Sequence, residues 1–222
     1  DLSSRLRAAP LLTLQPPDPL LSLIAKYNAD ARPEKIDLGV GVYRDATGAT
    51  PVMKSIKSAE ASLLLSQATK SYIGPEGDIG FVERIENLIF GKAAPGRTLG
   101  VQTPGGTGAL RLAATLARAG NPGGQIWLGT PSWPIHAQIF EHAGLKVRTF
   151  QSQDAATGQP SLENILAALD QSHPGDVLLM HGCCHNPTGL DYTPPQWREI
   201  AARVVERNVI PLIDLAYHGL GN

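Results

Sequence analysis

Residues 176–189, DVLLMHGCCHNPTG, and residues 209–217, VIPLIDLAY, each place a polar cluster directly after an apolar run. An apolar run of this length is typical of a buried strand. In α/β sheets, ligands bind in the crevice outside such strand ends. Asn186, Asp214 and Tyr217 are therefore predicted to meet at one edge of a sheet. There an amide, a carboxylate and a phenol could hold an aromatic heterocycle that has a basic nitrogen and an oxygen substituent.

Outward from these two stretches, predicted strands and helices alternate. Short apolar runs bounded by Gly, Pro and Asn predict strands, and longer amphipathic segments predict helices. The expected strands are 99–103, 125–129, 145–150, 176–181 and 209–213. The expected helices are 20–28, 54–66, 79–90, 135–143, 162–170 and 194–207, and one more helix follows the turn at 105–108 and runs through residue 119. The alternation predicts an α/β fold with a mostly parallel sheet that is covered by helices on both faces.

The composition is that of an ordinary globular protein. Of the 222 residues, 42% are hydrophobic and 18% are charged, and the net charge is −1. This balance gives no electrostatic reason to expect nucleic acid or an anionic membrane as a partner. The sequence shows no apolar run long enough to span a bilayer and no signal-peptide pattern at its start. Cys183 and Cys184 are adjacent, so we expect both to be reduced and the protein to be cytoplasmic.

The segment His181-Gly182-Cys183-Cys184-His185 also raises the question of a metal site. Ligands packed this closely along an extended segment are expected to point to alternate sides. In addition, the sequence offers no second cluster to complete a tetrahedral site. We therefore expect no bound metal.

A glycine-rich turn, Gly105-Gly106-Thr107-Gly108, follows one predicted strand and opens a helix. Unpaired backbone N–H groups and the positive end of the helix can hold a phosphate there, and Thr107 can add a hydroxyl donor. A purely conformational role for the glycines is the alternative. Trp133 follows the next strand, where it can stack on a planar ring or simply pack in the core.

Asp214 ends an apolar strand, where an ionised carboxylate needs a cationic partner or several donors. It is expected either to satisfy a local cap or salt bridge, or to pair with a protonated ring nitrogen. His136 and His181 can contact Asp214 on the side away from the ligand and hold its carboxylate in place, although each can equally be an ordinary hydrogen-bonded histidine. A phosphate cradle, a stacking tryptophan, a ring-pairing aspartate and an Asn/Tyr pair together describe a site for pyridoxal 5'-phosphate (PLP).

The sequence also resembles the aspartate and aromatic-amino-acid aminotransferases, which have the fold-type-I PLP architecture. The resemblance covers nearly the whole chain and rests on several ordered motifs. These are Asp37–Tyr43, Tyr72–Gly74, Gln102–Leu110, Pro131–Pro134, His181–Gly189 and Asp214–Gly219. Two positions depart from the family pattern: His218 stands where Gln is common, and Leu220 stands where Phe is common.

The resemblance implies a role for each cofactor-binding residue. Gly105, Gly106 and Thr107 would hold the phosphate, and Trp133 would stack on the pyridine ring. Asp214 would keep the ring nitrogen protonated. Asn186 and Tyr217 would hydrogen-bond to the 3-oxygen of the ring, while His136 and His181 would lie behind Asp214.

The resemblance also implies how substrate and subunits come together. Val40 and Gly41 would approach the substrate, beside Trp133 and Asn186. Tyr72 would reach the phosphate in a neighbouring subunit, which makes the expected active unit a homodimer. Pro131 and Pro187 would be cis prolines.

The implied domain organisation is an N-terminal arm (1–17), a small-domain segment (18–49) and a partial PLP-binding large domain (50–222). In the family the catalytic lysine follows the pair that corresponds to Asp214 and Tyr217, whereas the last lysine here, Lys146, precedes the Asn186 motif. The lysine that forms a Schiff base with PLP is therefore expected beyond Asn222. In the family, two later strands lie between the strands expected here at 99–103 and 209–213, so the sheet is expected to be incomplete and the chain to be part of a longer polypeptide.

The expected function is PLP-dependent transamination between aspartate or aromatic L-amino acids and 2-oxoglutarate. The motifs do not separate the aspartate from the aromatic donors. Two alternatives stay open. One is another PLP reaction, by a lyase or a decarboxylase, and the other is a non-catalytic binding protein with the same fold.

Overall fold

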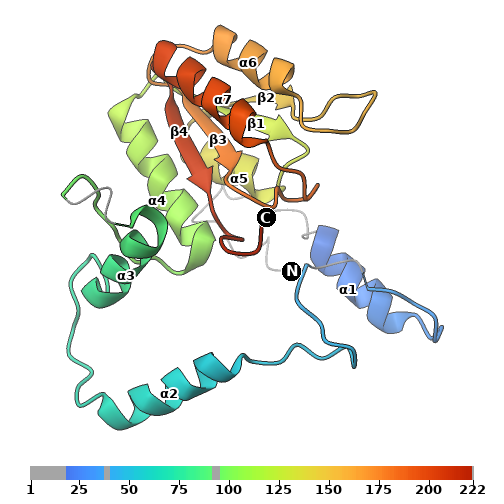
Figure 1. Cartoon of the computed structure of the whole chain (residues 1–222), viewed down its shortest axis with the longest axis vertical. Helices are drawn as coiled ribbons and strands as arrows, with labels where there is room; N and C mark the ends of the chain where they lie inside the picture. The colour runs from blue at the N-terminus through green and yellow to red at the C-terminus, as the bar shows by residue number, and fades with distance from the viewer. Residues whose placement is uncertain (1–18, 38–40, 92–95, 222) are drawn as a thin grey trace, which may run out of the picture. The chain divides into compact units, whose positions relative to one another are not determined.

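The computed structural model describes residues 19–37, 41–91 and 96–221 (Figure 1). The chain divides into two compact units, of which the first ends at Ser71 and the second begins at Tyr72. The arm predicted over 1–17 lies outside the described residues, and the predicted division at residue 49 stays a prediction. None of the helices formed by the described residues is both long and apolar enough to cross a membrane.

The first unit contains helices α1 (Pro19–Ala29) and α2 (Lys54–Ser66), as predicted. Lys35 caps the C-terminal end of α1. Its Nζ donates hydrogen bonds to the carbonyl oxygens of Tyr27 at 2.8 Å and Asp30 at 2.7 Å. The predicted turn at 45–48 is present and is closed by a hydrogen bond from the Gly48 N–H to the Asp45 carbonyl.

The second unit is built on a parallel sheet whose strand order is β2-β1-β3-β4. Its strands are β1 (Gln125–Thr130), β2 (Lys146–Gln151), β3 (Val177–His181) and β4 (Ile210–Asp214), which confirms four of the predicted strands. The register pairs His181 with Asp214. The polar clusters that follow β3 and β4 therefore start side by side at the same edge of the sheet.

Helices cover both faces of this sheet, as predicted (Figure 1). One layer contains α4 (Gly105–Gly120) and α5 (Ile135–His142), and the other contains α6 (Leu162–Gln171) and α7 (Pro194–Glu206). Alternation along β1 places Ile126 and Leu128 in the first core and Trp127 in the second. This is the two-residue period of a strand that is buried on both faces.

The prediction of a strand at 99–103 is wrong. The segment lies beside the turn before α3 (Ile79–Phe90), where the Gln102 N–H donates to the Glu76 carbonyl at 2.8 Å. Leu99 is 90% exposed, so the segment is not buried in the sheet. A strand needs a neighbouring ladder for its N–H and C=O groups, and the described residues supply no strand between this segment and β4.

The outer side of β4 is accordingly open. Ile210 and Ile213 are exposed, and a mainly apolar cavity of about 610 Å³ lies between β4 and α4. The two further strands expected from the family resemblance would lie along this edge.

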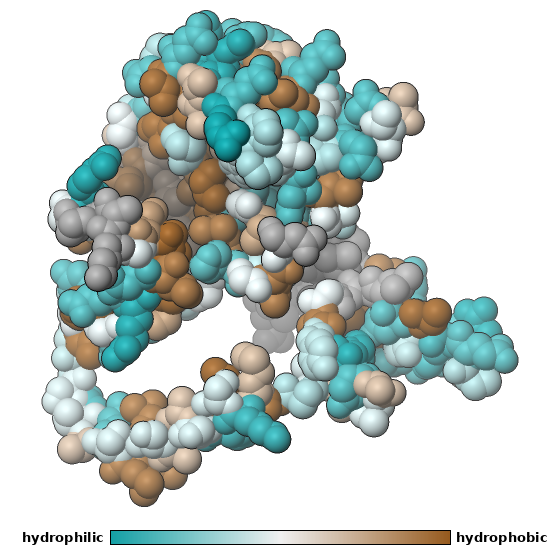
Figure 2. Space-filling view, in the orientation of Figure 1, coloured by the Kyte–Doolittle hydropathy of each residue, from teal (hydrophilic) through white to brown (hydrophobic). Residues whose placement is uncertain are grey.

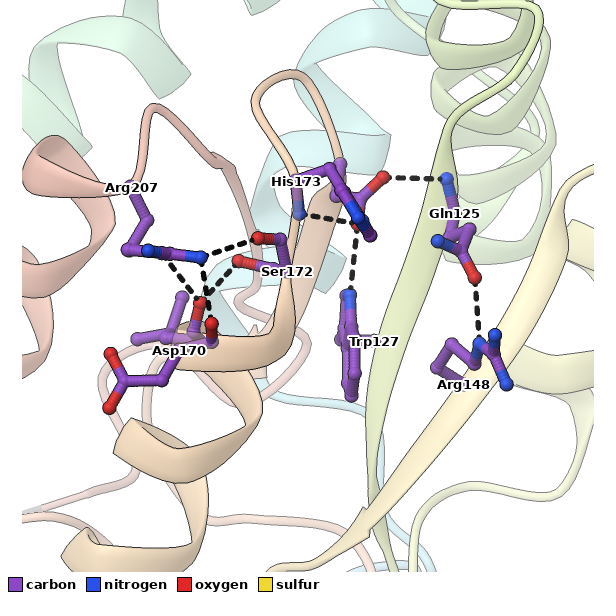
Figure 3. A network of polar contacts seen from close by, with 9 residues as sticks. Gln125, Trp127, Arg148, Asp170, Ser172, His173 and Arg207 are labelled. Carbon is purple, nitrogen blue, oxygen red and sulfur yellow. Dashed lines mark hydrogen bonds and ion pairs between the residues drawn. The ribbon is translucent and has the colours of Figure 1, made fainter.

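The opposite end of the sheet is held together by Asp176, which is 2% exposed. Its carboxylate accepts hydrogen bonds from the backbone N–H of Gln125 at 3.0 Å, the backbone N–H of His173 at 3.0 Å and the indole N–H of Trp127 at 3.2 Å (Figure 3). Nearby, the Arg207 guanidinium donates to the carbonyls of Asp170 and Ser172. The Asp176 contacts tie the start of β1 to the loop before β3, and the Arg207 contacts tie the end of α7 to the end of α6.

Candidate functional site

A cavity of about 320 Å³ opens at the carboxyl ends of the strands. This is the edge at which ligands of parallel α/β sheets bind. The residues that line it come from α4, the loop after β1, the end of β3 with its following loop, and the end of β4 with its following loop. They are Gly106, Thr107, Leu110, Trp133, His181, Asn186, Asp214, Ala216 and Tyr217.

The glycine-rich segment is the first turn of α4 rather than a loop before it, because the helix begins at Gly105. The backbone of Gly105 has a φ of 69°, which glycine adopts without strain, and its N–H donates to the Thr103 carbonyl. Gly106 and Thr107 line the cavity. A Cβ added to Gly106 would meet nothing within 4 Å. Open space beside the amino end of a 16-residue helix suits an anion.

Asp214 is held from behind by a buried histidine. Its Oδ2 accepts from Nε2 of His136 at 3.1 Å, and its Oδ1 accepts from the Ala216 N–H at 3.0 Å. These hydrogen bonds, with His136 contributing most, hold the pKa of Asp214 below its usual value. The other ring nitrogen of His136, Nδ1, lies 2.9 Å from the Ser132 hydroxyl. An ionised carboxylate is thus fixed in orientation at the wall of the cavity.

His181 lies beside this pair, with its ring centroid 5.4 Å from that of His136 and 4.4 Å from that of His185. Burial, together with the neighbouring His185 and His136, lowers the pKa of His181 to about 4. The imidazole is therefore neutral at neutral pH and leaves Asp214 as the charged group at this wall.

The depressed pKa of His181 predicts a loss of stability in mild acid. Below the ordinary histidine pKa of about 6.5, His181 binds a proton in the unfolded chain, whereas in the folded chain it stays neutral down to about pH 4. The free energy of unfolding therefore decreases as the pH is lowered. When the pH is lowered from about 7.5 to about 5, His181 is expected to reduce the free energy of unfolding by roughly 2 kcal/mol. Urea unfolding of wild type and His181→Gln at both pH values measures it. The exposed His142→Gln variant serves as the control, and an unchanged pH dependence in His181→Gln would contradict the prediction.

Asn186 and Tyr217 meet at the mouth of the cavity, where Nδ2 of Asn186 lies 3.4 Å from the phenol oxygen of Tyr217. Trp133 packs edge-on against His136, with ring centroids 5.2 Å apart. Pro131 and Pro187 follow cis peptide bonds, as predicted. An indole, an amide and a phenol therefore surround the same space as the Asp214 carboxylate.

Within the second unit, Gly105, His136 and Tyr72 do not line this cavity, and the structure places neither Gly41 nor Val40 relative to it. Gly105 is adjacent to it but does not line it, and Tyr72 is 99% exposed. Gly41 belongs to the first unit, where it is exposed, and Val40 lies outside the described residues.

Sequence reasoning missed Ser132 and His185. Ser132 lies in the turn before α5, four residues ahead of His136, and this short separation is the one signal that could have indicated their contact. His185 offers no comparable local signal, because it meets His181 only through the bend between them.

The described residues also bring His136, His181 and Asp214 together, with ligand-type atoms within 4.8 Å of one another. This group differs from the one considered in the sequence, since it includes neither cysteine. Nε2 of His136 is already hydrogen-bonded to Asp214, so the arrangement is accounted for as the support of a carboxylate.

Known proteins resemble this chain in both sequence and fold. Residues 33–222 match the family model described as aminotransferase class I and II. The chain is 51% identical over 212 residues to the tyrosine aminotransferase of Rhizobium meliloti (strain 1021) and 44% identical over 212 residues to the aspartate aminotransferase of Escherichia coli (strain K12). These alignments cover 95% and 94% of this chain, respectively, and 54% of each relative.

Among solved structures, the aromatic-amino-acid aminotransferase from Burkholderia pseudomallei, described as covalently bound to pyridoxal phosphate, superposes with a TM-score of 0.91 at 35% identity. The match covers 96% of this chain and 55% of that one, and it confirms the expected fold type. The chain thus spans about half the length of the relatives it matches. By its sequence match and its fold, the chain belongs to the aminotransferase class I and II family.

Proposed function

We propose that this chain forms the cofactor-orienting part of a PLP-dependent aminotransferase that transfers an amino group between aspartate or aromatic L-amino acids and 2-oxoglutarate. The observation that carries the proposal is the single cavity lined by Thr107, Trp133, Asn186, Asp214 and Tyr217. The relatives named above as tyrosine and aspartate aminotransferases support both classes of donor.

The residues present fit PLP. The first turn of α4 would bind the phosphate through the N–H groups of Gly106 and Thr107, and Gly105 would provide the backbone turn that presents them. Trp133 would cover one face of the ring. Asn186 and Tyr217, which contact each other, would hydrogen-bond to the 3-oxygen.

The chemistry that PLP supplies when bound is an electron sink for bond breaking at the amino acid α-carbon. Asp214 would hold a proton on the pyridine nitrogen, because its low pKa keeps it ionised beside that nitrogen. His136 would keep the carboxylate oriented through its 3.1 Å hydrogen bond. His181, neutral at working pH, would add no competing positive charge.

The protein is further proposed to be a cytoplasmic homodimer. Ile56, Leu63, Leu64 and Leu65 of α2 are exposed, and Figure 2 shows hydrophobic side chains along this helix. A second copy would cover such a surface, and the exposed Tyr72 would reach the partner's phosphate. Cys183 and Cys184 are free thiols, as a reducing compartment requires.

Val40 and Gly41 are proposed to approach the substrate beside Trp133 and Asn186. The support for this assignment is the match of their segment to the family, since Val40 lies outside the described residues.

The assay that tests the function uses the full-length polypeptide loaded with PLP. Aspartate, phenylalanine and tyrosine are each supplied with 2-oxoglutarate, and glutamate formation is followed. Turnover with at least one donor is expected, and its rate relative to the others identifies the preferred class. Absence of glutamate formation with all three donors would overturn the proposal.

Alanine substitutions at Gly105 and Gly106 should separate folding from phosphate binding. Gly106→Ala places a methyl group in the open space of the proposed phosphate seat, so we expect PLP affinity to fall about tenfold with stability unchanged. Gly105→Ala is expected to cost about 1 kcal/mol of stability, because a φ of 69° is unfavourable for alanine. PLP titration and urea unfolding of both variants measure the two effects. Equal PLP affinity in Gly106→Ala and wild type would rule out this seat.

A further inference from the structure

Cys183 and Cys184 lie between β3 and Asn186, and the proposed cofactor chemistry uses neither thiol. Both are free and half-buried. The backbone of Cys184 has a φ of 50°, in the left-handed region. The segment is therefore bent at this residue, and the expectation that adjacent side chains point to alternate sides of an extended chain does not hold for the two sulfurs.

Both sulfur atoms lie beside Gly221. A Cβ placed on Gly221 would be 3.5 Å from Sγ of Cys184 and 3.8 Å from Sγ of Cys183. The two thiols also interact, since burial and the neighbouring Cys184 both raise the pKa of the Cys183 thiol. They form a vicinal dithiol, whose two sulfurs can bond to one and the same soft atom.

Trivalent arsenic matches this dithiol better than zinc does. Structural zinc takes four ligands. Among the described residues two sulfurs lie at this place, and Nδ1 of the neighbouring His185 is already hydrogen-bonded to the Thr188 hydroxyl. Burial and the adjacent Cys184 raise the pKa of the Cys183 thiol, so at neutral pH it stays protonated. An organic arsenic(III) oxide reacts with protonated thiols: two S–H bonds and the arsenic–oxygen bond are replaced by two As–S bonds, and one water leaves. No atom changes oxidation state.

Arsenic bound to the two thiols would affect the cofactor cavity through Tyr217, which contacts Cys183 and also lines the cavity. Sγ of Cys183 donates to the Tyr217 carbonyl at 3.3 Å, and formation of an As–S bond removes that hydrogen. The Tyr217 phenol lies 3.4 Å from Nδ2 of Asn186 at the mouth of the cavity. A group bound between the sulfurs would also occupy the space beside Gly221, four residues after Tyr217.

We propose that Cys183 and Cys184 form a chelating site for trivalent arsenicals and that its occupation loosens Tyr217 and weakens PLP binding. The chelation stands on the geometry of the two thiols, whereas the effect on PLP rests on the proposed function.

The first test uses phenylarsine oxide on the full-length polypeptide, read by intact mass and by peptide mapping. We expect one arsenic atom to be bound to the peptide that contains both cysteines, and both cysteines to be protected from N-ethylmaleimide. The dithiol 2,3-dimercaptopropanol should release the arsenic, whereas a monothiol at the same concentration of thiol groups should not. Cys183→Ser and Cys184→Ser should each bind the probe at least about tenfold more weakly, because one As–S bond is lost. Adduct retention equal to wild type in either variant, or unprotected cysteines in wild type, would overturn the site.

The second test compares PLP affinity with and without bound phenylarsine oxide. About tenfold weaker binding in the loaded protein is expected, and equal affinity would overturn the coupling to Tyr217. If the protein binds no PLP even without arsenic, the proposed function fails, whereas the mass and protection results still decide the dithiol site.

Discussion

Replacing Asp214 with Asn is expected to lower kcat of the PLP-loaded full-length polypeptide about a thousandfold, or roughly 4 kcal/mol in the barrier. The reason is electrostatic. His136 and the Ala216 N–H keep the Asp214 carboxylate ionised at the cavity wall, where it can hold a proton on a pyridine nitrogen. A neutral amide of the same shape cannot stabilise that proton, so the ring withdraws fewer electrons from the α-carbon.

The matched control is Asp191→Asn, because Asp191 is a carboxylate in the same loop as Asn186 that does not line the cofactor cavity. We expect its kcat to stay within about threefold of wild type. Transamination rates at saturating donor, with PLP content measured from absorbance, separate lost chemistry from lost cofactor. Similar kcat values for Asp214→Asn and wild type at equal PLP content would refute the role of Asp214.

Replacing Asp176 with Ala is expected to lower the free energy of unfolding by about 4 kcal/mol. The substitution leaves the Gln125 N–H, the His173 N–H and the Trp127 indole N–H without their acceptor. Each buried donor without a partner costs roughly 1–3 kcal/mol, and the removed side chain leaves a cavity in addition.

Asp170→Ala provides the comparison. Asp170 is half-exposed and forms an ion pair with Arg203, so its removal should cost less than about 1 kcal/mol. Urea unfolding followed by circular dichroism measures both variants. A loss below about 1 kcal/mol for Asp176→Ala would show that water satisfies these donors and that the network is not a main support of the sheet.

Local signals explain why so much of the second unit could be predicted. The apolar runs of β1, β3 and β4 and the amphipathic periods of the helices depend on neighbours within one element. The start of α7 is an example: the Thr193 N–H donates to Oε1 of Gln196 at 2.8 Å, as the spacing of these residues predicts. The same reasoning gave a wrong prediction for segment 99–103. A strand also needs a neighbouring strand to pair with, and the sequence of the segment itself does not show whether one is present.

Some features of the site could likewise be predicted from local sequence, and others could not. The sequence by itself determined the family, the parallel α/β fold and the strand ends that carry Asn186, Asp214 and Tyr217, because short-range patterns and ordered motifs encode them. Only the tertiary structure decided that His136 supports Asp214 from 78 residues away and that both cysteine sulfurs lie beside Gly221. These contacts depend on the register between strands and on one left-handed residue, Cys184, which no local pattern of side chains specifies.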